Sequence, residues 1–191
     1  DRASYGGSND GHSAGIMRYV SIRHGGTQLA AANEINGLTL GGVGSGTTLD
    51  HIEVVSNLDD GIEFFGGTAS ITNAVVAFAG DDSFDWDQGY HGKGQYWFAL
   101  NDHTVGDRGG ELDGDDSPNV TSSGQPYATP EVYNVTMIGR GIAAGKQGLL
   151  FRAGSGGFVN NMIMANFQEG IEIEDKQDPS DAFDKLGAGL L

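Results

Sequence analysis

The chain has 191 residues and a formal net charge of −16, from 26 acidic and 10 basic side chains. This excess of negative charge argues against nucleic acid and anionic membranes as partners, because both attract basic surfaces. Cysteine is absent, which excludes disulfides, thiolate metal sites and thiol nucleophiles. The length fits one domain over residues 1–191, and no apolar run is long enough for a membrane-spanning segment.

A five-residue segment recurs along the sequence: a polar residue, then glycine or serine, then an apolar, a polar and a second apolar residue. Neighbouring copies begin 22 or 24 residues apart, except for one interval of 65 residues, which fits three coils or two coils with an insertion. The spacing predicts a solenoid with coils of roughly 22 residues. The copies are Asn36–Leu40, Asp60–Phe64, Asp82–Trp86, Gln147–Phe151 and Glu169–Ile173.

A second family of strand-like segments keeps the same phase, and glycine-rich corners such as 41–42 and 66–67 separate the two families. Alternation within the first family puts its two apolar residues on one face, where stacked coils would bury them. The links are too short for the helices of βαβ units. An antiparallel sandwich is the alternative, but it gives no reason for coils to resemble one another. The second family comprises Ile16–Val20, Leu49–Glu53, Ile71–Val75, Val132–Thr136 and Phe158–Met162.

Six further segments carry a recognisable pattern: Met17–Gly26, Glu34–Gly44, Asp59–Gly67, Gly80–Asp85, Gly106–Glu111 and Tyr133–Gly141. They resemble a family of secreted bacterial right-handed parallel β-helix proteins, whose members are often outer-membrane lipoproteins or carry secretion-sorting tails. The resemblance implies an all-β, right-handed parallel β-helix with a secreted or cell-surface location. It implies no activity, because most members have none assigned.

The coil rhythm breaks between Phe98 and Lys146, so residues 98–146 are expected to form an inserted loop that interrupts the repeat. Long loops on rigid folds are frequent binding sites. Oxygen-rich, glycine-spaced carboxylates suit Ca²⁺, which takes six to eight oxygen ligands. We therefore predict a calcium site in this loop and no other cofactor, with a merely solvated acidic loop as the alternative. The predicted ligands are Asp107, Glu111, Asp113, Asp115 and Asp116.

Carboxylates also occupy corresponding corners of neighbouring coils, with Asp59 and Asp60 on one and Asp81 and Asp82 on the next. Stacked strands lie about 4.8 Å apart, so these charges would repel unless hydrogen-bonded, hydrated or bridged by a cation. The simplest interpretation is that the corner residues accept turn N–H groups. A second acidic column, of Glu63, Asp85 and Glu172, is expected on the outward face.

The spacing of Asp60, Asp81 and Asp82 also resembles the carboxylates of polygalacturonase-type glycoside hydrolases, which are β-helices as well. The resemblance implies that Asp82 is the acid and that Asp60 and Asp81 activate water. The expected Gly-His-Gly is 102–104, Asp-His-Thr, in this chain, and the Arg-x-Lys element is missing. We therefore commit to no catalytic residue.

Aromatic residues near the expected loop, Tyr90, Tyr96, Trp97 and Tyr127, either stack on sugar rings or pack the loop onto the solenoid, and we favour packing. Taken together, the sequence predicts an extracellular structural, adhesive or binding solenoid, stabilised by cations and able to associate end to end. The alternative is a carbohydrate-active enzyme or glycan binder that uses Asp60, Asp81 and Asp82.

Overall fold

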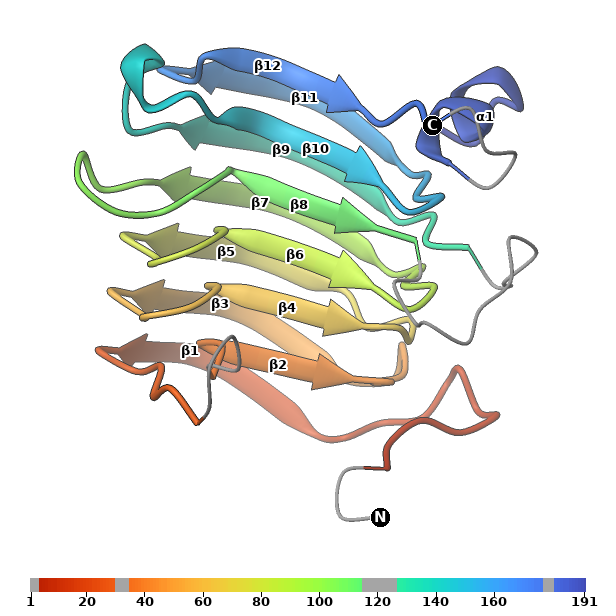
Figure 1. Ribbon diagram of the computed structural model, residues 1–191. Helices are drawn as coiled ribbons and strands as arrows, with labels where there is room; N and C mark the ends of the chain where they lie inside the picture. The colour runs from red at the N-terminus through yellow and green to blue at the C-terminus, as the bar shows by residue number, and fades with distance from the viewer. Residues whose placement is uncertain (1–3, 30–34, 115–126, 177–180) are drawn as a thin grey trace.

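The computed structural model describes residues 4–29, 35–114, 127–176 and 181–191, and it forms a parallel β-helix (Figure 1). The strands form two six-stranded parallel sheets. Successive strands alternate between the sheets, so each odd-numbered strand is followed in the chain by an even-numbered strand of the other sheet. In Figure 1 the chain runs rightward in the front sheet and leftward in the rear one as it rises, which is a right-handed winding. The parallel pairing excludes the antiparallel sandwich and confirms the predicted fold.

The long-strand sheet contains the odd-numbered strands, and the short-strand sheet contains the even-numbered ones. In the order of the long-strand sheet these are β1 (Ile16–Arg23), β3 (Thr48–Val55), β5 (Ile71–Ala77), β7 (Lys93–Leu100), β9 (Glu131–Ile138) and β11 (Phe158–Ala165). The short-strand sheet contains β2 (Leu38–Gly41), β4 (Ile62–Phe65), β6 (Phe84–Asp87), β8 (Gly110–Asp113), β10 (Gln147–Arg152) and β12 (Glu169–Ile173). A 3₁₀ turn, η1 (Ile142–Ala144), and a short helix, α1 (Ala182–Gly187), complete the elements of the described residues.

Stacked aromatic rings fill the middle of the core. Phe64 lies 4.3 Å from Tyr90, and Phe84 lies 4.5 Å from Trp97, measured between ring centroids. Tyr90 and Trp97 are buried, and each finds a backbone acceptor for its polar hydrogen, Ala69 for the hydroxyl and Ile71 for the indole. These two residues therefore pack the core, as favoured from sequence, and are not available to a ligand.

Inward-facing columns follow the predicted alternation as far as the last coil. Register pairs Ile62 with Phe84 and Phe64 with Trp86, and all four side chains are buried. Ile171, at the corresponding position of β12, is 51% exposed because β12 has a paired neighbour on one side only within the described chain.

One residue in each long strand has a positive φ, and strand register aligns these residues in a column. The left-handed conformation divides each long strand into two straight runs. Asparagine tolerates this conformation better than most residues, and it occupies three of the six positions. The column consists of Tyr19, His51, Asn73, Tyr96, Asn134 and Asn161.

The expected loop over residues 98–146 is shorter than predicted, because β8 and all of β9 lie within it as regular strands. The 65-residue interval is therefore two coils with an insertion between β8 and β9. The repeat was missed at β8 because Gly110 stands in register with Phe84 and Leu149, where the pattern calls for an apolar side chain. No helix of the described residues has the length and apolar character needed to cross a membrane.

Candidate functional site

Carboxylates line the outer surface of the short-strand sheet, which we call the acidic face. Strand register places Glu63 beside Asp85 and Asp85 beside Glu111, so one outward column runs across β4, β6 and β8. The predicted alignment of Glu63 with Asp85 is confirmed. Glu172 does not continue the column, because Leu150 lies between it and Glu111.

Buried aspartates join the corners that precede β4, β6 and β8. Asp60 Oδ1 accepts the backbone N–H of Asp82 at 2.9 Å, and Asp82 Oδ1 accepts the backbone N–H of Arg108 at 2.5 Å. Asp60 is 7% exposed and Asp82 is 3% exposed. The predicted acceptance of corner N–H groups is therefore correct, but each bond reaches the next coil rather than closing a local turn, and so it fixes the stacking of the coils.

Burial raises the pKa values of both Asp60 and Asp82. It raises the pKa of Asp82 to about 8, with help from the charges of Glu111 and Asp81 and against the opposing charge of Arg108. Burial also raises the pKa of Asp60 well above its ordinary value, and the neighbouring Asp82 and Glu63 add to the effect. Asp82 is therefore poised to hold a proton near neutral pH, and the pKa of Asp60 is shifted in the same direction.

Asp60, Glu63 and Asp85 form what we call the carboxylate cluster. One oxygen from each residue lies within 4.8 Å of the others. Asp85 Oδ1 is a buried atom with no hydrogen-bond partner in the described part of the chain. Burial raises the pKa of Asp85 well above its ordinary value, and it raises the pKa of Glu63 to about 7 despite a hydrogen bond from the Asn36 amide.

The three residues of the carboxylate cluster form no ion pair with a basic side chain within the described residues. The electrostatic neighbours that act on them are other carboxylates, including Asp82 and Asp113. A buried oxygen without a donor, among like charges, costs free energy unless a proton or a cation reaches it. All donors in the cluster are oxygens, which suits a hard cation such as Ca²⁺.

Acidic residues farther along the same face are neutralised by the protein itself. Arg108 Nη1 lies 2.8 Å from both Asp107 Oδ2 and Glu111 Oε1, and Lys146 contacts Asp107 as well. Arg152 Nε lies 2.7 Å from Asp113 Oδ1. We call these residues the arginine-paired group.

Three of the five predicted calcium ligands, Asp107, Glu111 and Asp113, belong to the arginine-paired group, where protein cations already contact them. The other two, Asp115 and Asp116, lie outside the described residues.

The pairings of Arg108 with Asp107 and Glu111 are close in sequence and could have been predicted from spacing. The pairing of Arg152 with Asp113 could not, because Arg152 lies a whole coil and an insertion away. One oxygen from each of Asp107, Asp81 and Asp82 also lies within 4.8 Å of the others, but Arg108 contacts that group, whereas the carboxylate cluster has no such partner within the described residues.

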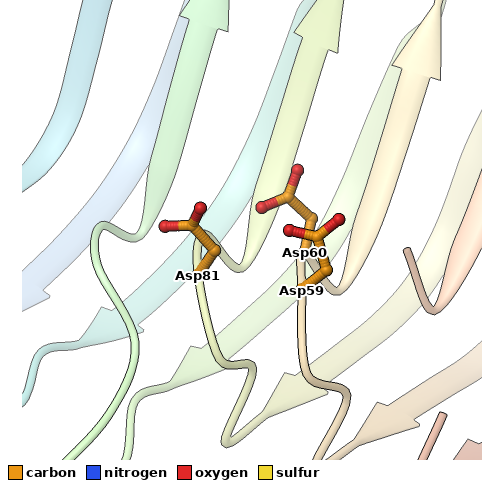
Figure 2. Close-up of side chains that lie close together, drawn as sticks. All are labelled: Asp59, Asp60 and Asp81. Carbon is orange, nitrogen blue, oxygen red and sulfur yellow. The ribbon is translucent and has the colours of Figure 1, made fainter. Parts of the chain in front are cut away.

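The corners also bring Asp59, Asp60 and Asp81 together, with one oxygen of each within 4.8 Å of the others. Figure 2 shows Asp59 and Asp60 rising from one corner and Asp81 from the next, with their carboxylates on the same side. The three residues of the hydrolase resemblance, Asp60, Asp81 and Asp82, thus occupy neighbouring corners as expected. Only Asp81 among them is exposed. Asp60 and Asp82 are buried, and each already accepts a hydrogen bond from a backbone N–H group.

Comparison with protein families gives one result. A family model described as a pectate-lyase-like beta helix domain matches residues 1–187. Searches of curated proteins and of solved structures returned no match.

Proposed function

The chain belongs to the family of pectate-lyase-like β-helix domains. We propose that it is an extracellular binding and structural solenoid whose acidic face holds a divalent cation. The cation would lie at the carboxylate cluster, between Asp60, Glu63 and Asp85. The observation that carries the proposal is the buried Oδ1 of Asp85, which has no partner within the described residues.

The charge distribution supports this position over others on the acidic face. A cation bound here would relieve the repulsion among Glu63 and Asp85, which strand register places side by side, and Asp60, which lies in the corner before β4. It would also link β4 to β6, as the aspartate hydrogen bonds link the corners. Calcium is the best candidate, because three carboxylates with completing waters satisfy its preference for six to eight oxygens.

A catalytic role has weaker support. The raised pKa of Asp82, about 8, would keep its carboxyl protonated at neutral pH, as a general acid requires. The same side chain is 3% exposed, and its oxygens contact the backbone and guanidinium of Arg108. A glycosidic oxygen would have to displace these contacts, so we place glycoside hydrolysis second.

Calcium titration tests the proposal directly. Calorimetry on metal-free protein should show saturable binding, and saturating Ca²⁺ should raise Tm by about 5–10 °C for a chain of this size. Asp85→Asn should lose most of both effects, because it replaces one ligand oxygen of the cluster with an amide nitrogen.

Glu169→Gln is the matched control, since it removes one negative charge from an exposed position of the same sheet. It should bind calcium as the unmodified protein does. The proposal fails if the unmodified protein shows neither binding nor a Tm shift, or if Asp85→Asn responds like Glu169→Gln.

A further inference from the structure

The outer surface of the long-strand sheet contains a groove of about 340 Å³ that is separate from the acidic face. Two columns of side chains border it. Phe98, Thr136 and Ile163 are directly paired across β7, β9 and β11, and a second column of Tyr96, Asn134 and Asn161 lies two residues earlier in the same strands. The groove therefore crosses three coils along the solenoid axis.

The lining of this groove carries no charged side chain, although the protein as a whole has a net charge of −16. Its borders combine an exposed phenol ring, Tyr96 at 54%, with two amides and one hydroxyl. Asn161 Nδ2 donates to Asn134 Oδ1 at 2.5 Å, which leaves the amide nitrogen of Asn134 and the carbonyl of Asn161 as further hydrogen-bonding groups. Such a surface suits a ligand that is neutral, rich in hydroxyls and apolar on one face.

Tyr96 holds a backbone conformation that is costly for its type. Its φ is 61°, in the column where three other coils use asparagine. A bulky residue in the left-handed region is strained, and such strain persists where another requirement outweighs it. The ring of Tyr96 is exposed and therefore gains little from burial. Tyr19 holds the same conformation in β1 away from the groove, so the conformation alone does not single out Tyr96. Its exposed ring beside the amides of the groove does, and this points to a contact made outside the chain.

We propose that this groove binds a neutral oligosaccharide laid along the solenoid axis. Tyr96 stacks on the apolar face of a sugar ring, and Asn134, Asn161 and Thr136 bond to its hydroxyl groups. Because strands repeat at about 4.8 Å, successive rings meet successive coils. The rigid sheet holds these groups in place before binding, so little entropy is lost when the ligand docks.

The Tyr96→Asn variant tests ligand affinity without the complication of a loss in folding stability. The variant removes the ring but installs the residue that this backbone position prefers, so its Tm should equal or exceed that of the unmodified protein. Its affinity should fall by about tenfold or more, the usual cost of losing an aromatic contact at the centre of a site. The ligands to test are cello-, xylo-, manno- and malto-oligosaccharides, with oligogalacturonate as the charged comparison, each titrated by calorimetry.

Tyr19→Asn is the control, because Tyr19 occupies the same position of the column in β1, outside the groove. It should leave affinity unchanged. The proposal is overturned if no neutral oligosaccharide binds at millimolar concentration, or if Tyr96→Asn binds as tightly as Tyr19→Asn. Dimerisation that depends on Tyr96, with no sugar bound, would equally overturn it and assign the groove to a second copy.

Discussion

Two regions of the acidic face contain similar carboxylates but are neutralised differently. In the arginine-paired group, Arg108, Arg152 and Lys146 contact the acids of β8 and its corner. In the carboxylate cluster, Asp85 stands one coil earlier and Glu63 two coils earlier, and within the described residues no basic side chain reaches them. Within the described residues, basic side chains therefore neutralise the outward column at its β8 end, whereas at the β4 and β6 end its charge is left to protons or an external cation.

The largest effect on stability should come from removing an arginine of the arginine-paired group. Arg108→Gln would remove the guanidinium that contacts Asp82, Asp107 and Glu111 in a part-buried setting, since the Arg108 side chain is only 17% exposed. Asp107 would keep Lys146 and Glu111 would keep Arg152, so the buried Asp82 would lose most. We expect a loss of about 3–5 kcal/mol in the free energy of unfolding, as for a broken buried pair. Urea denaturation followed by circular dichroism measures it.

Arg23→Gln provides the matched control, because Arg23 pairs with Glu53 where both side chains are well exposed. That change should cost far less than Arg108→Gln, because exposed ion pairs contribute little to stability. Equal losses in the two variants would show that the arginine-paired group contributes no more than an ordinary surface pair.

The sequence predicts the fold well because the fold depends on local, repeated signals. Alternation located Phe64, Phe84 and Trp86 in the core, and the glycine corners marked the coil boundaries. The prediction failed at β8, where Gly110 replaces the expected apolar residue and is accommodated between its neighbours. A single coil without the pattern was enough to make the stretch around it look like a loop, although the second strand family places Val132–Thr136 correctly within β9.

The site was predicted less well, for a different physical reason. Sequence shows where carboxylates are dense but not which basic residues reach them across coils. Arg152 pairs with Asp113, 39 positions earlier, and this pairing turned a predicted calcium ligand into half of an ion pair. Glu63 and Asp85 were recognised as a column, but their burial, which raises their pKa values, depends on packing that no motif records.

Changing pH should have a moderate effect that belongs to the carboxylate cluster and its neighbours. The pKa of Glu63 rises from 4.5 to about 7, and the pKa of Asp82 from 3.8 to about 8. The folded state therefore binds protons that the unfolded state has released, so stability is highest below pH 4 for these groups and falls as pH rises toward 8.

Thermal unfolding of metal-free protein between pH 5 and pH 8.5 tests this dependence. Tm should fall with rising pH, at about 2–4 °C for each kcal/mol lost. Saturating Ca²⁺ should flatten the curve, because a bound cation stabilises the ionised carboxylates. A metal-free Tm that rises over this range would contradict the raised pKa values.

The smallest effect, and the sharpest comparison, concerns Asp85 alone. In chelator at pH 8, Asp85→Asn should be more stable than the unmodified protein by about 1 kcal/mol, because a neutral amide replaces a buried charge among like charges. In saturating Ca²⁺ the order should reverse, since only the unmodified protein gains the free energy of a fully ligated ion. Glu169→Gln should follow the unmodified protein in both conditions. If Asp85→Asn were still the more stable protein in saturating Ca²⁺, Asp85 would be destabilising both with and without the ion. Its buried oxygen would then bind a proton rather than a cation.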